Sequence, residues 1–180
     1  KRFFSAATFA MFMFGTASAA DLGGKVLKVG SDTTYPPMET VDPATGQIVG
    51  FDVDLVNAIC AKINCKAEFV TTAWDGIFGA LQQGSFDLVA SGVSITDERK
   101  QTMDFTEPYL IVSQAVLLRV ADEGLTIDEF KTKGYKLAAQ TATTNATLAE
   151  ELLGRDNVAL YDTFTGAVVA LKNGDVKGVI

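Results

Sequence analysis

The sequence predicts an α/β protein of two lobes, each with a mixed sheet covered by helices. Apolar runs of strand length alternate with helical stripes over residues 25–90 and again over residues 135–180. The second set has too little room to belong to the first sheet, so we place a lobe boundary near residues 110–116. Lobe 1 is therefore expected at residues 21–112, and lobe 2, with its C-terminal part missing, at residues 113–180.

The composition fits a folded protein and argues against two classes of function. Hydrophobic residues make up 48% of the 180 residues, which is enough for a packed core and argues against disorder. The formal net charge is −7, whereas nucleic-acid binding needs a basic face, so we expect no nucleic-acid partner. The sequence contains no histidine, which excludes a catalytic scheme based on imidazole.

The first 20 residues have the pattern of a secretory signal peptide. Lys1 and Arg2 give a basic start, residues 3–14 are largely apolar, and residues 17–19 are Ala-Ser-Ala, a small-residue cleavage site. The apolar run is short for a membrane span, although an uncleaved membrane anchor is the alternative. No cysteine lies at the cleavage site, so a lipoprotein is not expected. Residues 1–20 are therefore expected to be removed on export.

Strands and helices are predicted to alternate in lobe 1. Apolar residues recur at a spacing of four from Phe51 to Ile63, which predicts a helix over 51–63. The stretch before it is rich in Pro, Thr, Gly and Asp, which predicts loops with a short hairpin arm at 46–50. The other elements expected in lobe 1 are strands at 25–31, 66–71 and 86–90 and a helix at 74–83 that ends at Gly84.

Lobe 2 begins with an apolar run at residues 113–120, which predicts a strand. The last strand, at 176–180, is expected to leave an unpaired apolar edge, which favours aggregation. Because the sequence starts with Lys1 and stops inside that strand, we expect a fragment of a longer gene product. Between these two strands, further strands are expected at 135–140 and 158–161 and helices at 126–130, 144–153 and 163–171.

Small polar residues follow the strand predicted at 86–90. Ser91, Gly92 and Ser94 combine hydroxyl groups with a glycine at which the backbone can approach a ligand closely. Open α/β sheets bind their ligands at the carboxyl ends of the strands. We therefore expect these three residues to lie at a binding site.

Arg99 follows in a predicted helix start. Thr96 is a favourable N-cap, and Asp97 and Glu98 are suited to the first helical turn. The planar guanidinium of Arg99 matches a carboxylate through two hydrogen bonds. An ordinary helix start with a solvated arginine is the alternative.

Four motifs occur in an order typical of one protein family: Gly50-Phe51-Asp52-Val53-Asp54-Leu55, Trp74-Asp75-Gly76, Gly84-Ser85-Phe86-Asp87 and the block Ser91–Tyr109. Together they resemble bacterial solute-binding protein family 3, the polar amino-acid-binding proteins of ABC importers, over residues 25–180. The resemblance implies the type II periplasmic-binding-protein fold. It also implies a monomer of the periplasm that captures a free polar L-amino acid between its lobes and delivers it to the importer's membrane permease. No cofactor and no metal are implied.

The resemblance implies a set of ligand-binding residues as well. The arginine that corresponds to Arg99 holds the α-carboxylate of the ligand, and the two threonines Thr143 and Thr144 bind the same carboxylate from lobe 2. Trp74 is expected to pack on the ligand, and Ser91, Gly92 and Ser94 to make polar contacts with its ammonium and carboxylate groups. Asp32 and Tyr35 are expected at the end that receives the ligand side chain.

Three alternatives stay open for these residues. Asp32 and Tyr35 belong to a turn in one interpretation, Trp74 is a core residue in another, and Thr143 and Thr144 only cap a helix in the third.

Some positions concern the fold or depart from the family pattern. Asp52 and Asp54 are expected to cap the helix 51–63, with Phe51 packed beneath it. Ala142 replaces the usual glycine before the threonines, so its methyl group crowds the ligand or requires an unfavourable backbone angle. Lys177 stands where an aspartate is common.

Two cysteines, Cys60 and Cys65, lie near the end of the helix predicted at 51–63. The family often has a small disulfide at this place, and disulfides persist in exported proteins. A Cys60–Cys65 disulfide is therefore expected, with a pair of buried thiols as the alternative.

An enzyme on the same fold is the second candidate function. Periplasmic cyclohexadienyl or arogenate dehydratases share this architecture and need a general acid in the cleft. Glu39 or Glu107 would have to supply it. Nothing in the spacing of the residues requires this, so a binding protein is the preferred interpretation.

Overall fold

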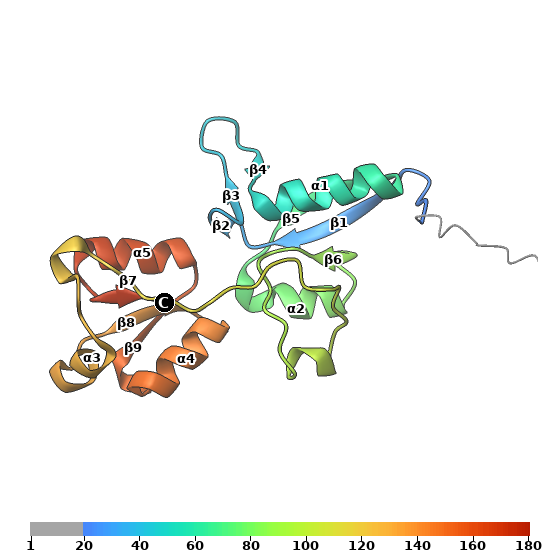
Figure 1. The fold of residues 1–180 in the computed structure, drawn as a ribbon. Helices are drawn as coiled ribbons and strands as arrows, with labels where there is room; N and C mark the ends of the chain where they lie inside the picture. Colours follow the sequence, from blue (N-terminus) through green and yellow to red (C-terminus); the bar gives the residue numbers. More distant parts are fainter. Residues whose placement is uncertain (1–19) are drawn as a thin grey trace, which may run out of the picture.

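The computed structural model describes residues 20–180 as two α/β parts joined by an extended crossing of the chain (Figure 1). We call the part built on the sheet β5-β1-β6 lobe 1 and the part built on the sheet β7-β10-β8-β9 lobe 2. The expected signal peptide lies outside the described residues, except for Ala20. No helix within residues 20–180 is both long enough and apolar enough to cross a bilayer.

Lobe 1 is a parallel three-stranded sheet with a helix on each crossover. Every residue of β1 pairs with β5, from Lys25 opposite Cys65 to Ser31 opposite Thr71. One buried core cluster contains Trp74 and Ile77 of α2 and Phe86, which lies two residues before β6. The bounds are β1 Lys25–Ser31, α1 Phe51–Ile63, β5 Cys65–Thr71, α2 Trp74–Gln82 and β6 Leu88–Val89.

A small antiparallel sheet replaces most of the loop expected before α1. It contains β2 Thr34–Tyr35, β3 Glu39–Val41 and β4 Ile48–Val49, in that order. The expected hairpin arm is therefore one strand of three. Backbone N–H groups of Phe51 and Asp52, in the first turn of α1, donate to the carbonyl oxygens of Pro37 and Met38. These bonds attach the small sheet to the helix.

Lobe 2 is a mixed four-stranded sheet in which only β7 runs antiparallel. The bounds are β7 Leu117–Leu118, α3 Ile127–Lys133, β8 Leu137–Gln140, α4 Thr144–Leu153, β9 Val158–Tyr161, α5 Phe164–Asn173 and β10 Gly178–Val179.

Two expectations about the strands of lobe 2 are wrong. The strand expected at 113–120 is only β7, because residues 103–116 form neither helix nor strand and cross between the lobes. The expected apolar edge at 176–180 does not exist, because β10 lies inside the sheet. Gly178 and Val179 pair with β7 on one side and with β8 on the other.

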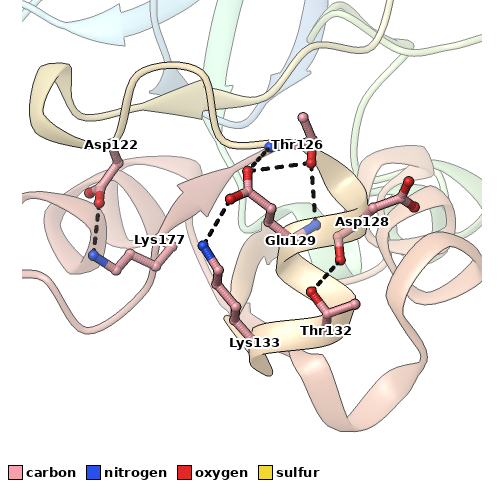
Figure 2. Close-up of polar contacts among 7 residues, drawn as sticks. All are labelled: Asp122, Thr126, Asp128, Glu129, Thr132, Lys133 and Lys177. Atoms are coloured by element: carbon pink, nitrogen blue, oxygen red, sulfur yellow. Dashed lines mark hydrogen bonds and ion pairs between the residues drawn. The ribbon is translucent and has the colours of Figure 1, made fainter.

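Polar contacts at the far end of lobe 2 explain the start of α3 (Figure 2). Thr126 and Glu129 form a capping box, in which Glu129 N donates to Thr126 Oγ1 at 3.3 Å and Thr126 N donates to Glu129 Oε2 at 3.1 Å. Lys177 Nζ forms an ion pair with Asp122 at 2.8 Å, which connects the approach to β10 with the turn after β7. The unusual Lys177 is thereby explained as a structural residue.

The expected disulfide is confirmed. Cys60 near the end of α1 is bonded to Cys65 at the start of β5, and Asn64 between them has a left-handed φ of 53°. We predict that replacing both cysteines with alanine lowers the free energy of unfolding by about 2 kcal/mol, because the closed loop is short. Urea unfolding measures this loss. Dithiothreitol should destabilise the wild type equally and the double variant not at all, and no effect on the wild type would contradict the prediction.

Candidate functional site

One cleft of about 940 Å³ lies between the two lobes. It is lined by residues from the carboxyl ends of β1, β6 and β8, which is where open α/β sheets bind ligands. All of the expected binding residues line this cleft, namely Asp32, Tyr35, Trp74, Ser91, Gly92, Ser94, Arg99, Thr143 and Thr144.

Arg99 lies in the cleft wall against a pair of aromatic rings, Trp74 and Phe78, which pack edge to face on each other. Its Cζ is 5.4 Å from the ring centroid of Trp74 and 4.9 Å from that of Phe78. Nη1 donates to the carbonyl oxygen of Ser94 at 2.9 Å. No carboxylate within residues 20–180 forms an ion pair with this guanidinium. Burial lowers the pKa of Arg99, so a ligand carboxylate would compensate for lost hydration.

The helix expected after Thr96 is only a 3₁₀ turn, Arg99–Gln101. Thr96 Oγ1 accepts a hydrogen bond from Arg99 N at 3.2 Å, but the chain does not continue as an α-helix. Thr96 therefore fixes the backbone of Arg99 and does not cap an α-helix. This single turn presents the arginine without a helix.

Asp32 connects the two lobes. Its Oδ1 accepts from the backbone N and the hydroxyl of Thr34, at 3.2 and 2.8 Å, so Asp32 does stabilise a turn. Its Oδ2 accepts from Gln140 Nε2 of β8 at 2.6 Å. Gln140 is only 6% exposed, and its Nε2 also donates to the carbonyl oxygen of Asp162 at 3.1 Å.

Sequence reasoning gave Gln140 no role of its own. It stands at the last position of β8, and this location at the carboxyl end of a strand was the available signal.

Two more contacts cross the cleft. Trp74 Nε1 donates to the carbonyl oxygen of Ala142 at 3.0 Å, so Trp74 is both a core residue and a cleft residue. The rings of Tyr35 and Phe164 meet edge to face with centroids 5.1 Å apart. Phe164 is the first residue of α5 and was missed, because nothing in its sequence context distinguishes it from an ordinary core position.

The polar groups of Ser91 and Gly92 are engaged with buried carboxyl groups. Ser91 Oγ donates to Glu39 Oε1 at 2.6 Å and accepts from Asp32 N at 2.9 Å. Gly92 N donates to Asp52 Oδ2 at 2.6 Å. These two residues therefore build the wall of the cleft through their hydrogen bonds.

Asp52 does not have the expected helix-capping role. The N-cap position of α1 is Gly50, without a side-chain hydrogen bond, and the carboxyl of Asp52 accepts from Gly92 N and from Tyr109 Oη at 3.0 Å. The expectation that Phe51 packs beneath the helix is also wrong. Phe51 is 45% exposed and lies next to the Tyr109 ring, at 6.1 Å between centroids.

The threonine turn of lobe 2 shows both a cap and a strained residue. Thr143 Oγ1 accepts from Ala146 N at 3.1 Å, as an N-cap does, and donates to the carbonyl oxygen of Gln140 at 2.7 Å. Thr144 Oγ1 accepts from Gln114 Nε2 at 3.3 Å. Ala142 has a φ of +59°, which is the unfavourable angle expected from the missing glycine.

The two candidate general acids differ in their surroundings. Glu39 is fully buried, and burial raises its pKa to about 8. Its Oε1 already accepts from Ser91. Glu107 is exposed on the crossing segment. Both residues are among those that line the cleft, but the side chain of Glu39 is fully buried.

The chain was compared with protein families and with proteins of known structure. The family described as bacterial extracellular solute-binding proteins, family 3, matches residues 27–177. A probable histidine-binding protein of Neisseria gonorrhoeae is 39% identical over 166 residues, which cover 91% of this chain and 61% of that protein. The ABC transporter arginine-binding protein 1 of Escherichia coli K12 is 33% identical over 183 residues, covering 99% and 70%.

A solved structure shows the same fold. The ancestral amino acid-binding protein AncCDT-1, a precursor of cyclohexadienyl dehydratase, is 36% identical with a TM-score of 0.80, covering 86% of this chain and 68% of that one. The chain thus spans about two thirds of the length of these proteins. Its motifs, its two-lobed α/β fold and these matches agree, and the chain belongs to the bacterial extracellular solute-binding proteins, family 3.

Proposed function

We propose that this chain is the ligand-capturing part of a periplasmic solute-binding protein that delivers an L-amino acid with a cationic side chain to the membrane permease of an ABC importer. It acts as a monomer, and the lobes close on the ligand by a hinge in the crossing segment, with the boundary between residues 112 and 113. The observation that supports this most directly is the placement of a free guanidinium, Arg99, and a carboxylate, Asp32, in one cleft.

Arg99 fits the α-carboxylate of the ligand. A guanidinium has five N–H donors, of which the Ser94 carbonyl occupies one, and its planar fork matches a carboxylate bidentately. The rings of Trp74 and Phe78, which pack on each other beside the guanidinium, restrict its orientation. In this proposal Thr143 and Thr144 reach the same carboxylate from lobe 2, while Ser91, Gly92 and Ser94 shape the wall.

Asp32 and the aromatic pair fit a cationic side chain. The Asp32 carboxylate receives only neutral donors, from Thr34 and Gln140, so its charge is uncompensated by any lysine or arginine within the described residues. Tyr35 and Phe164 add aromatic surface beside it, which favours a cation. The names of the two relatives, which refer to histidine and arginine, agree with this ligand class.

Binding without catalysis is the function that the cleft supports better than dehydration. The side chain of Glu39 is fully buried and accepts a hydrogen bond from Ser91, and the relatives are named as binding proteins. AncCDT-1, the neighbour related to a dehydratase, is itself described as an amino acid-binding protein. Production of phenylpyruvate or phenylalanine from prephenate or arogenate would contradict this part of the proposal.

We predict that Asp32→Asn weakens L-arginine binding at least about tenfold, because the amide cannot pair with a cation. L-Glutamine binding should change less. Isothermal calorimetry with L-arginine, L-histidine and L-glutamine measures both effects, and Asp54→Asn, on the exposed face of α1, is the control with the same change of charge. If none of the twenty amino acids binds, the proposed function is wrong. An equal loss for arginine and glutamine would overturn only the role of Asp32.

A further inference from the structure

Two fully buried carboxyl groups, Glu39 of β3 and Asp52 of α1, are hydrogen-bonded to the Ser91–Gly92 wall of the cleft. Each has one oxygen that is hydrogen-bonded to the wall. Glu39 Oε1 accepts from Ser91 Oγ, and Asp52 Oδ2 accepts from Gly92 N and Tyr109 Oη.

The other oxygen of each group, Glu39 Oε2 and Asp52 Oδ1, is buried and has no hydrogen-bond partner within residues 20–180. Buried polar atoms almost always have a partner, so these two require an explanation.

No cation compensates these carboxyl groups. The titratable groups that face them are Asp32 of the β1–β2 turn, Tyr35 of β2 and Tyr109 of the crossing segment, all of which are acids. No lysine or arginine in the described part of the chain forms an ion pair with either group. Glu39 and Asp52 lie within hydrogen-bonding range of each other's side chain. Two such carboxylates without a cation are too costly to bury, and sharing one proton removes this cost.

We propose that Glu39 and Asp52 share a single proton, and that this protonated pair positions the Ser91–Gly92 wall and Tyr109 of the crossing segment. The proton lies on Glu39 Oε2 and is donated to Asp52 Oδ1, which gives both unpartnered oxygens a partner. Asp52 is the ionised member, because its two donors stabilise a carboxylate while Glu39 has one. The effect on ligand binding rests on the proposed function, but the shared proton does not.

The directions in which the two pKa values are shifted agree with this assignment. Burial, together with the charges of Asp52 and Asp32, raises the pKa of Glu39 to about 8. Burial also raises the pKa of Asp52, but the hydrogen bonds from Gly92 and Tyr109 oppose the shift.

The raised pKa of Glu39 determines how the stability of the folded state depends on pH. Between the ordinary glutamate value of 4.5 and about 8, the folded state holds a proton that the unfolded state has lost. The stability that this proton contributes is therefore fully present below 4.5 and is lost as the pH rises to about 8, by at most about tenfold in the unfolding equilibrium per pH unit. Four other carboxyl groups have lowered pKa values, so their effect on stability changes with pH only below their ordinary pKa values, outside this window. They are Asp21, Asp87, Asp122 and Glu129.

The test is a carboxyl-carbon NMR titration of the whole chain from pH 4 to 9.5, without ligand. We expect one glutamate Cδ signal to titrate near pH 8, and the Gly92 amide signal to shift with the same midpoint. In Glu39→Gln both transitions should be absent, because the side-chain amide donates to Asp52 at every pH. Glu68→Gln, at an exposed position of β5, is the matched control and should retain both.

A second variant covers the case in which Glu39→Gln fails to fold. In Asp52→Asn the new amide donates to Glu39, so the glutamate midpoint should fall by at least about two pH units. Titration of every glutamate below pH 6 in the wild type would overturn the shared proton. A Gly92 amide that does not follow the glutamate would overturn its positioning role. A failed ligand screen would leave both readouts unchanged and would refute only the proposed function.

Discussion

Replacing Arg99 with alanine is expected to abolish amino-acid binding while the fold stays intact. Arg99 is the only arginine that lines the cleft within the described residues. Its guanidinium donates a hydrogen bond to the nearby Ser94 carbonyl, so its loss should not separate distant elements of the fold. Loss of a charge-assisted bidentate contact costs about 3 kcal/mol or more, which corresponds to at least about a hundredfold in affinity. Calorimetry with L-arginine gives the affinity, and circular dichroism reports the fold.

Two further variants separate charge from geometry. Arg99→Lys keeps the charge but loses the planar fork, so it should bind more weakly than the wild type and more strongly than Arg99→Ala. Arg155→Ala removes an arginine whose side chain is 85% exposed and should leave affinity unchanged. An unchanged affinity of Arg99→Ala would exclude the carboxylate-binding role.

Gly50→Ala is expected to destabilise lobe 1 strongly. Gly50 has a φ of 139° and a ψ of −179°, a conformation essentially restricted to glycine. A Cβ at this position would clash with the backbone carbonyl of Met38 and would lie 2.9 Å from Glu39 Cα. These are backbone atoms, so no side-chain rotation relieves the contact. Strain and overpacking together predict a loss of about 3 kcal/mol or more in the free energy of unfolding.

The control for this prediction is Gly46, in the loop between β3 and β4. Gly46 has a φ of +70°, but a Cβ there would meet no atom within 4 Å. Gly46→Ala should therefore cost only about 1 kcal/mol, from the left-handed angle alone. Urea unfolding of both variants gives the comparison, and equal losses would show that the Met38 contact relaxes without cost.

The sequence predicted secondary structure best where the residues of a single element show its periodicity. The spacing of four between apolar residues predicted α1 from Phe51 to Ile63 without error, and the run Val158–Tyr161 is strand β9 as expected. Ser91, Gly92 and Ser94 line the cleft, as their position after a predicted strand indicated. The roles of the other binding residues were expected from the resemblance to the family and not from local periodicity.

Contacts between distant segments were not predictable in this way. Asp52 looked like a helix cap because aspartate is common in a first turn, yet its partners are 40 and 57 residues away. The bond from Gln140 to Asp32 joins residues 108 apart. Such contacts depend on how the lobes approach each other. The small sheet was missed for a related reason, since strands of two or three residues are too short to show alternation.

The position of β10 inside its sheet has a consequence for the order of folding. The sheet of lobe 1 uses strands that are all complete by Val89, so it can form from the first half of the chain. In lobe 2, β7 has no partner until β10 arrives, about sixty residues later in the sequence, and β8 has a partner on only one side until then. Closing such long loops before any pairing energy is gained is slow. Lobe 2 is therefore expected to complete its sheet after lobe 1, when Gly178 and Val179 insert between β7 and β8.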